Sequence, residues 1–489
     1  MRRDDKAAAT AVSGTGTVPS LREAPYGDRP TKEENRMGTR AWRSFALVSI
    51  FALISMACGG GGGSPAPGAT GTPAGGGSPP AGGSPAGAEP AGTPGPGGQI
   101  GGSVSVVGSW TGSEQESFEA MVAPFEESTG VSVEYTGSRD LAAQLTTGVQ
   151  SGNLPDVAGL PGPGLMTEWY DQGALKALPF VDLEGYRGDT PEGFADLGVH
   201  EDGSLIGIFV KAAVKGLIWY NVDVFEGERP ADWEGVTATD PAPADSLWCV
   251  GFESGAASGW PGTDWIEDIV IRQAGPEVYD AWVRGEQTWT SPEIRGAFET
   301  FGEVVENTAG GGNAIITTPF GSGGNGMFED PPECKFHHQA SFMSDFFVNE
   351  AGVTAEQFDF FVMPPISGDV GEVVTGAGDL FGMFNDTPQA QALIQHLLTP
   401  EAQQIWVERG GAISASRTVP LDAYPDEASR KSAEALQEAA SFRFDGSDQM
   451  PNEMNQAFFR AMVEFAQNPD QIDSILADLD ETQQDAYED

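Results

Sequence analysis

A glycine- and proline-rich segment near the N-terminus limits where this chain can fold. Residues 59–102 consist mostly of Gly, Pro, Ala, Ser and Thr and hold almost no large apolar side chains. Such a segment cannot bury enough apolar surface to offset the entropy that is lost on ordering. We therefore expect a flexible tether over residues 58–102 and a folded region over residues 103–489.

An apolar stretch, SFALVSIFALISM, lies before the tether, and three arginines between positions 36 and 43 come before the stretch. Positive residues followed by a short apolar run and small residues are the pattern of a secretory signal peptide. The run is shorter than the ~20 residues that a membrane-spanning helix needs. We expect a signal peptide over 37–57. The polar residues 1–36 are either a misassigned start or a disordered leader.

Cys58 stands at the end of this signal, after Ala57 and before a run of glycines. The arrangement resembles the lipobox of bacterial lipoproteins, in which this cysteine carries the lipid. The chain departs from the pattern at Ser55, where leucine is usual. We expect lipidation of Cys58 and an extracytoplasmic protein anchored to the cell membrane through that lipid alone. Secretion without an anchor is the alternative.

The chain is strongly acidic, with 72 Asp and Glu against 25 Lys and Arg and a formal net charge of −47. Such a surface repels the phosphates of nucleic acids and the head groups of anionic lipids. Nucleic acid is therefore excluded as a partner, and an uncharged or cationic ligand fits better than an anionic one.

Two cysteines, Cys249 and Cys334, lie in the folded region. An even pair in an exported protein is typical of a disulfide, and two buried thiols are the alternative. The chain has no CxxC pair, and the alternation in CKFHHQASF indicates a strand around His337 and His338 rather than a metal site. We expect neither a metal nor a cofactor.

Hydrophobic periodicity predicts an α/β fold. Strands are expected at VSVV, VSVEY and DVAGL, and helices at EQESFEAMVAPFEE and DLAAQLTTGVQSG between them. This alternation is typical of a unit with a mostly parallel sheet. A long apolar run with two lysines follows over 207–219, then a strand at FDFFVMPP and a helical last part. The folded region exceeds the usual size of one core, so we expect two lobes.

The order of these segments resembles that of the substrate-binding proteins of ABC importers that take up sugars, the maltose-binding-protein-like group called extracellular family 1. The resemblance covers nearly all of 103–489. It is carried by GSWTGSEQESFEAMVAPFEESTGVSVEY, GNLPDVAGL, GSLIGIFVKAAVKGLIWYNVDVF, FDFFVMPP and HLLTPEAQQIWVERGGAISASR. VKGLIWYN and GSWTGSEQ are most similar to the α-glucoside subgroup. The family's proline after the GG pair is replaced by Ala412 and Ile413, which changes the expected shape of that loop.

The resemblance implies a two-lobed periplasmic-binding-protein type II fold with the ligand in the cleft between the lobes. Lobe one would comprise about 103–212 and 375–425, and lobe two about 213–374 and 426–489. The implied function is capture of a sugar, an α-glucoside for the subgroup, by lobe closure and its delivery to the importer's membrane subunits. The protein would act as a monomer and would not be an enzyme.

Candidate ligand residues follow from how sugars are recognised. Aromatic rings stack on their apolar faces, and planar polar groups or lysines bond to their hydroxyls. The candidates stand at strand ends, beside glycines or in the crossover between lobes, where ligands of open α/β sheets bind. They are Trp110, Arg139, Asp140, Asp156, Lys211, Trp260, Asp264, Trp265 and Asp379.

Each candidate also has a structural interpretation as a core residue, a helix cap or a solvent-exposed charge. Lys215 shares the crossover with Lys211. Other tryptophans stand in helical or apolar settings and are expected in the core: Trp169, Trp248, Trp282 and Trp406.

Two other functions remain open. The same fold could bind a polyamine or another small solute. The acidity favours a polyamine slightly, and polyamine affinity would fall steeply with salt. An exported glycoside hydrolase would need two carboxylates placed on either side of the scissile bond. The chain has no GxSxG or HExxH motif and only four histidines.

Overall fold

The computed structural model describes residues 99–487 except 192, 226, 243–245, 369, 371–372 and 440. The leader, the signal peptide, Cys58 and nearly all of the tether lie outside the described residues.

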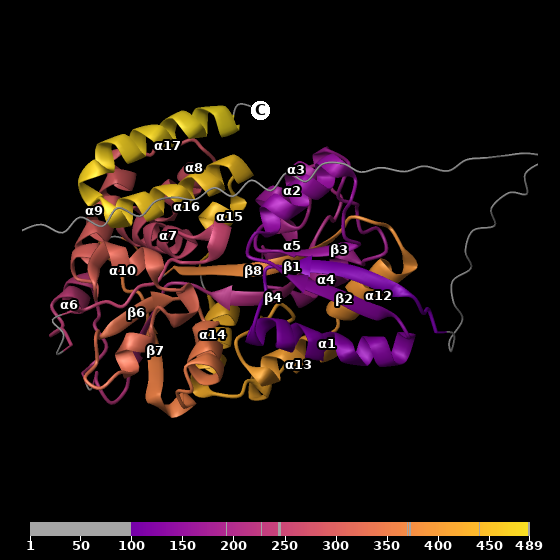
Figure 1. Cartoon of the computed structure of the whole chain (residues 1–489), viewed down its shortest axis with the longest axis horizontal. Coiled ribbons are helices and arrows are strands. Elements are labelled where there is room, and N and C mark those ends of the chain that lie inside the picture. Colours follow the sequence, from indigo (N-terminus) through magenta and orange to yellow (C-terminus); the bar gives the residue numbers. More distant parts are fainter. Residues whose placement is uncertain are drawn as a thin grey trace, which may run out of the picture. The chain divides into compact units, whose positions relative to one another are not determined.

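The first part of the folded region forms the predicted α/β unit. Strands β1 (Ser103–Gly108), β2 (Ser132–Gly137) and β3 (Val157–Leu160) pair in parallel in the order β2-β1-β3. Helices α1 (Ser113–Thr129) and α2 (Leu141–Ser151) connect them. The two helices lie on opposite sides of the sheet (Figure 1), as right-handed crossovers require. The predicted order of strands and helices is confirmed here.

Within the part of the chain that the structure describes, four more strands complete this sheet, which then has seven. They are β4 (Ile208–Val214), β8 (Val374–Met383), β9 (Ile413–Ser414) and β10 (Phe442–Phe444). β8 runs antiparallel to β3 and β4, and β10 runs parallel to β8. We call this sheet and its helices lobe one.

Lobe two is built on a smaller antiparallel sheet of three strands. Its order is β6 (Phe336–Gln339), β5 (Leu217–Asn221) and β7 (Phe358–Val362). The predicted strands around His337 and at FDFFV are therefore confirmed. The seven-stranded and three-stranded sheets with their helices make the two-lobed α/β fold, whose described elements Figure 1 shows.

The remaining helices divide between the lobes. Those of lobe one are α3 (Gly164–Asp171), α4 (Leu183–Asp189), α5 (Phe194–Leu197), α12 (Pro388–Leu397) and α13 (Pro400–Arg409). The helix α14 (Glu427–Glu438) also belongs to lobe one, where it packs on β4, β8 and β9. Those of lobe two and the connections are α6 (Trp233–Thr237), α7 (Trp260–Ala274), α8 (Pro276–Val283), α9 (Pro292–Glu306), α10 (Gly311–Thr317), α11 (Met343–Asp345), α15 (Gly446–Gln449), α16 (Asn452–Gln467) and α17 (Ile472–Tyr487). Short helical turns are η1 (Gly255–Ala257), η2 (Phe320–Ser322), η3 (Asn325–Phe328), η4 (Phe346–Glu350), η5 (Ala355–Gln357), η6 (Leu421–Ala423) and η7 (Pro469–Gln471).

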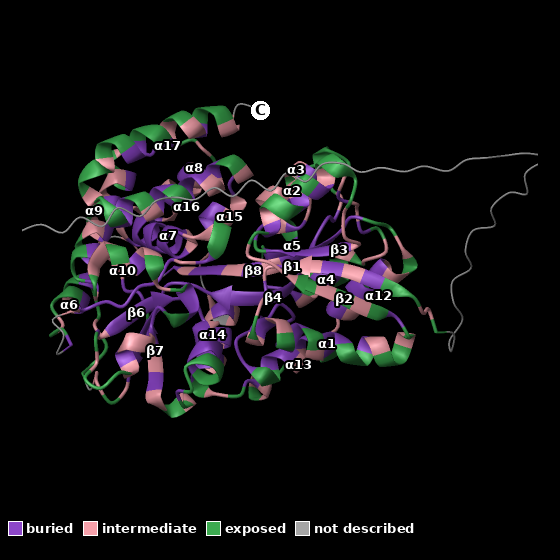
Figure 2. Ribbon diagram, viewed as in Figure 1, coloured by how far each residue is buried: buried purple, intermediate pink, exposed green. Residues whose placement is uncertain are grey.

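Apolar spacing explains which helix faces are buried. In α9 the buried side chains recur at helical spacing, from Ile294 through Phe298 and Phe301 to Val305. Figure 2 shows the result for the described residues: β4 is buried, while α1 and α17 carry exposed stripes. The four tryptophans predicted for the core are each at most 2% exposed, which confirms that prediction: Trp169, Trp248, Trp282 and Trp406.

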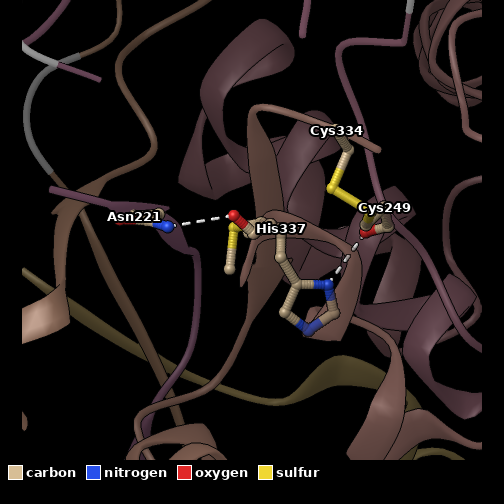
Figure 3. The surroundings of a disulfide bond; sticks show 5 residues. Asn221, Cys249, Cys334 and His337 are labelled. Atoms are coloured by element: carbon tan, nitrogen blue, oxygen red, sulfur yellow. Dashed lines mark hydrogen bonds between the residues drawn. A yellow bond between two sulfur atoms is a disulfide. The ribbon is translucent and has the colours of Figure 1, made fainter. Parts of the chain in front are cut away.

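Cys249 and Cys334 form a disulfide in lobe two (Figure 3), with their Cα atoms 5.5 Å apart. The bond lies beside β6, since the Cys249 backbone N–H donates to Phe336 and the Cys249 carbonyl lies 2.9 Å from Nδ1 of His337. Asn221 on β5 donates to the Met327 carbonyl nearby. The bond therefore ties the segment after α6 to the smaller sheet.

Among the described elements, the chain passes between the lobes at three places. Lys215 and Gly216 join β4 to β5, and the segment after β7 leads into β8. The last crossing comes later than the expected position 426. Residues 442–444 still pair with β8 in the larger sheet, so the crossing lies at Asp445. A side chain at Gly216 would meet Arg272 at 2.7 Å, which explains the glycine at the first crossing.

Candidate functional site

A cleft of about 550 Å³ lies between the lobes. Lobe one contributes the ends of β1 and β3, the start of α1 and one side of α2. Lobe two contributes the start of α7, the turn η2 and a face of α16. Strands β4 and β8, which run towards the crossings, supply its floor. Its volume falls within the range that is usual for small-molecule sites.

The floor follows from strand alternation. Lys211, Ala213 and Lys215 are spaced by two along β4 and its continuation, and all three line the cleft. On β8, Ala377 pairs with Ala213 and Asp379 pairs with Lys211. The floor therefore has small side chains in the middle and a lysine towards either end.

The lobe-one end of the floor is a charged cluster around Glu114 on α1. Lys211 Nζ lies 2.5 Å from Glu114 Oε1, and Arg139 Nη2 lies 3.2 Å from Glu114 Oε2. Burial would raise the pKa of Glu114, but the two cations outweigh it and lower the pKa. Glu114 is therefore ionised and holds both cations in place.

Asp379 lies beside this cluster and is less fully engaged. Its Oδ1 accepts a long hydrogen bond of 3.5 Å from Ser109 Oγ. Burial raises the pKa of Asp379 to about 6, although nearby Lys211 acts in the opposite direction. Asp379 can therefore change protonation near neutral pH.

The other end of the floor is a cluster around Lys215. Its Nζ lies 2.6 Å from Asp264 Oδ1 on α7 and also donates to Asp445 Oδ2 at the last crossing. Asp445 Oδ1 accepts from the Asp448 backbone N–H and caps α15. Burial raises the pKa of Asp264 to about 7, opposed by Lys215. Within the described residues, Asp264 Oδ2 is buried and has no hydrogen-bond partner.

The carboxylates of Asp264, Glu267 and Asp445 lie close enough together to ligate a metal ion. Lys215 Nζ already bonds to two of them. Glu267 accepts from the backbone N–H groups of Gly446 and Ser447 instead. The ammonium group thus supplies the positive charge that a cation would bring to these acids.

Aromatic side chains form one wall of the cleft. Trp260 begins α7 and packs edge-on against Phe320 of η2, with ring centroids 5.1 Å apart. The ring of Phe342 lies next to both, 6.0 Å from Trp260 and 6.4 Å from Phe320 between ring centroids. Trp110 also lines the cleft, but it is only 2% exposed and packs against Trp406 in the core of lobe one. Trp260 is therefore more accessible for stacking than Trp110.

Seven of the nine candidate residues line the cleft, and the fold brings them together from both lobes: Trp110, Arg139, Asp140, Lys211, Trp260, Asp264 and Asp379.

Trp265 and Asp156 do not line the cleft, and the expectation for them is corrected. Trp265 is 0% exposed and packs on His338 and Trp248. It follows Asp264 on a helix, so its side chain points about 100° away from that of Asp264. Asp156 stands at the amino end of β3, where its Oδ2 accepts from Ser105 N–H and Oγ. It joins two strands at the edge opposite to the one where ligands bind.

Several cleft residues were not among the candidates, notably Glu114, Phe342, Asp445, Ser447 and Asp448. Asp140 was chosen because it is a polar residue that follows a strand. The same criterion would have selected Asp445, which follows β10 in the stretch FRFDGSDQ. Glu114 stands in the first turn of a helix after Trp110, and nothing in that short stretch shows that it meets Lys211. Phe342 carries no sequence signal of this kind.

Residues 111–404 match the family described as bacterial extracellular solute-binding protein. The chain belongs to this family. Its membership accounts for the two lobes with a cleft between them, and the family places the protein outside the cytoplasm. Among the described residues, the helices are too short or too polar to cross a bilayer.

Two curated relatives of this solute-binding protein are each 37% identical to it. The osmoprotective compounds-binding protein GgtB of Synechocystis sp. aligns over 74% of this chain and 88% of its own length. The alpha-glucosides-binding periplasmic protein AglE of Rhizobium meliloti aligns over 75% of this chain and 83% of its own.

Solved structures share the fold at lower identity. The bacterial solute receptor AcbH has a TM-score of 0.68 at 17% identity, with 79% of this chain and 99% of the receptor covered. The GacH receptor of Streptomyces glaucescens has a TM-score of 0.62 at 15% identity, with 80% and 100% covered. At this identity the likeness concerns the fold alone.

Proposed function

We propose that this protein captures an uncharged α-linked glucoside in its cleft and delivers it to the membrane subunits of an ABC importer. The observation that carries the proposal is the floor of the cleft. Carboxylates of both lobes pair there with Lys211 and Lys215, beside the partly exposed ring of Trp260. The relative that binds alpha-glucosides, 37% identical over 385 residues, supports the choice of ligand.

The residue types suit a polyhydroxylated ligand. Carboxylates accept hydrogen bonds from hydroxyl groups, and ammonium or guanidinium groups donate to their oxygens. A sugar ring stacked on Trp260 gains about 0.5–1.5 kcal/mol beyond area burial. Most of the charges already pair with each other, as Glu114 does with Lys211, so the cleft does not demand a charged ligand.

Closure of the lobes over the ligand is the proposed mode of capture, without the making or breaking of a bond. The lobes already touch at the rim. Asp140 Oδ1 accepts from the Ala256 backbone N–H at 3.2 Å, and the Arg139 guanidinium lies 4.8 Å from the ring centre of Phe320. A ligand that contacts both lobes stabilises this closed arrangement over an open one. The importer would then recognise the closed form.

Lipidation of Cys58 and the tether behind it would hold the solute-binding domain, as a monomer, near the importer. The test is fatty-acid labelling of cells that express the protein or its Cys58→Ser variant. Label on the natural protein but not on the variant supports the anchor. A protein that is released from the membrane without label contradicts it.

Calorimetric titration of the purified protein with maltose, trehalose, sucrose and putrescine tests the ligand class. Saturable binding of a glucoside that does not change between low and high salt supports the proposal. Binding of putrescine alone, weakened steeply by salt, would assign the cleft to a polyamine instead. That second candidate is favoured by the cleft's lining, which among the described residues has six acids against three basic side chains. Release of glucose from a bound glucoside would indicate an enzyme.

A further inference from the structure

A segment of lobe two, residues 341–350, reaches the first turn of helix α1 in lobe one. It starts at Ser341, whose backbone N–H donates to the Val214 carbonyl and whose Oγ accepts from the Val214 N–H. These two bonds hold the segment against the end of β4. It continues through α11 into η4, which packs on α1. The segment therefore runs from the first crossing to the helix that carries Glu114.

The bond between this segment and α1 is made by Asp345. Ser113, the first residue of α1, donates from its Oγ to Asp345 Oδ2 at 2.5 Å. Asn349 donates to Asp345 Oδ1 at 2.6 Å, so each carboxylate oxygen has a donor. Asp345 is 5% exposed and does not line the cleft. The position also suits a carboxylate because the N-terminal end of a helix attracts negative charge.

Two glycines of lobe one make room for the segment. Gly112 precedes α1 with φ of +61°, and a Cβ atom there would lie 3.1 Å from Glu350 Oε1. Gly411, the second residue of the GG pair after α13, has φ of +73°, and a Cβ atom there would lie 2.5 Å from the Cβ of Asp345. The GG pair thus leaves a space that Asp345 occupies, and a side chain at Gly411 would displace the acid.

Ser113 is followed directly by Glu114, which holds the two cations at the lobe-one end of the cleft. Glu114 Oε1 lies 2.5 Å from Lys211 Nζ, and Glu114 Oε2 lies 3.2 Å from Arg139 Nη2. A shift of the first turn of α1 would move Glu114 away from both partners. In the same segment as Asp345, the ring centre of Phe342 lies 5.6 Å from Lys211 Nζ. The segment therefore borders this cluster directly and also supports it through α1.

We infer that Asp345 is a positioning residue of the binding site: it fixes the first turn of α1 and thereby holds Glu114 against Lys211 and Arg139. It acts through Ser113 and does not itself touch the ligand. The inference deepens the proposed function by adding a residue from outside the cleft, and the sugar titration below rests on that function. Without Asp345, the first turn of α1 loses its bond to lobe two and the cluster becomes mobile.

Chemical labelling of lysines tests this positioning without a ligand. Acetic anhydride acetylates a lysine when its amine becomes accessible, and mass spectrometry gives the rate for each lysine. In Asp345→Ala and Ser113→Ala, Lys211 should be acetylated about tenfold faster or more, the factor expected for loss of a hydrogen bond to a charged group. Lys215 is also buried, but its acids lie on α7 and at the last crossing, so its rate should stay within about twofold. A general loss of stability would expose both lysines alike.

Further variants separate the bond to Asp345 from other effects. Ser113→Thr keeps the hydroxyl group and should react like the natural protein. Gly411→Ala keeps both bonding partners but displaces Asp345, so it should expose Lys211. Gly352→Ala is its matched control, because Gly352 has φ of +71° and a Cβ atom there meets nothing within 4 Å. Thermal unfolding of every variant shows that the comparison is between folded proteins.

Calorimetric titration with maltose, trehalose and sucrose measures the effect on binding. The affinity for the sugar that the natural protein binds most tightly should fall about tenfold in Ser113→Ala and in Asp345→Ala. It should recover in Ser113→Thr. The double variant Ser113→Ala with Asp345→Ala should bind no more weakly than either single variant, because both changes remove the same hydrogen bond.

The inference is overturned if Lys211 is acetylated at the natural rate in both alanine variants, or if Lys211 and Lys215 become reactive together. It is also overturned if a sugar binds both variants with unchanged affinity. Failure of the proposed function looks different: none of these sugars binds the natural protein, while the acetylation rates still decide whether Asp345 positions the cluster.

Discussion

At the scale of single residues, the site is a set of buried charges that depend on one another. Lys215 lies between Asp264 and Asp445, and Lys211 lies against Glu114. Taking such groups out of water costs several kcal/mol per ion, and only close pairing repays it. The pairs therefore hold the side chains in place but add little to the net stability of the fold. A change in the protonation of one group removes part of this pairing.

Asp379 provides a pH-dependent prediction. Its pKa rises from 3.8 in the unfolded chain to about 6 in the folded protein because of burial, with Lys211 opposing and Glu114 adding to the rise. The folded state therefore holds more protons than the unfolded state between these values. The contribution of Asp379 to stability falls as pH rises through this window. Asparagine imitates the protonated form and lacks this dependence.

The expected result is that Asp379→Asn gains stability relative to the natural protein as pH rises from about 4 to about 7. The gain should be about 1–3 kcal/mol. Urea unfolding of both proteins across this range measures it. The same difference at every pH would show that Asp379 has an ordinary pKa.

At the scale of elements, the start of α3 determines how closely the lobes approach. A Cβ atom at Gly162 would lie 2.4 Å from the Asp448 carbonyl oxygen in α15. Gly164 is equally close to the Met450 carbonyl. These glycines let backbone of lobe one touch the chain where it enters lobe two.

Gly162→Ala should therefore hold the lobes apart. We expect glucoside affinity to fall about tenfold or more, since a 2.4 Å contact cannot persist and the closed form is lost. Stability should change by less than about 1 kcal/mol because both cores are untouched. Calorimetry and small-angle scattering with and without ligand measure these effects. Gly188→Ala in α4, where a Cβ meets nothing within 4 Å, is the control. Unchanged closure of the Gly162 variant contradicts the prediction.

The disulfide between Cys249 and Cys334 lies in lobe two. It joins cysteines separated by 85 residues, so it removes much conformational freedom from the unfolded chain. Reduction, or the double change Cys249→Ser and Cys334→Ser, should cost about 2–4 kcal/mol of stability. Thermal unfolding with and without reductant measures the loss. The double variant should not respond to reductant, and a response there would point to another cause.

At the scale of the whole molecule, the main electrostatic feature is the net charge of −47. Like charges repel within the compact fold, and salt screens that repulsion over a Debye length of about 10 Å at 0.1 M. The melting temperature should therefore rise between 10 mM and 500 mM sodium chloride. Differential scanning calorimetry measures this rise. Glucoside affinity measured over the same range should change by less than about twofold, because an uncharged ligand does not depend on screening. A melting temperature that is independent of salt contradicts the prediction.

Local pattern alone determined several elements of this protein, chiefly the first strands and helices of lobe one. The alternation in VSVV and VSVEY and the helical spacing of Phe118, Met121 and Phe125 depend on neighbouring residues, and the structure follows them in β1, β2 and α1. The polar residues after strands and in the crossover likewise located much of the cleft, including Arg139, Lys211 and Asp379. The spacing of apolar residues and the residue types found at turns are properties of short stretches, so a single sequence is enough to recognise them.

Only the tertiary structure decided which of these groups meet. Lys215 and Asp445 are 230 positions apart and bond because β10 joins the larger sheet beside β8. Trp265 and Asp264 are neighbours in sequence, yet Trp265 lies in the core and Asp264 faces the cleft. Successive side chains of α7 point in different directions around the helix axis, which separates the two. Sheet pairing and helix rotation are set by the packing of the whole core, which no short stretch encodes. The chain's local pattern therefore determined the kind of site, and long-range packing determined its members.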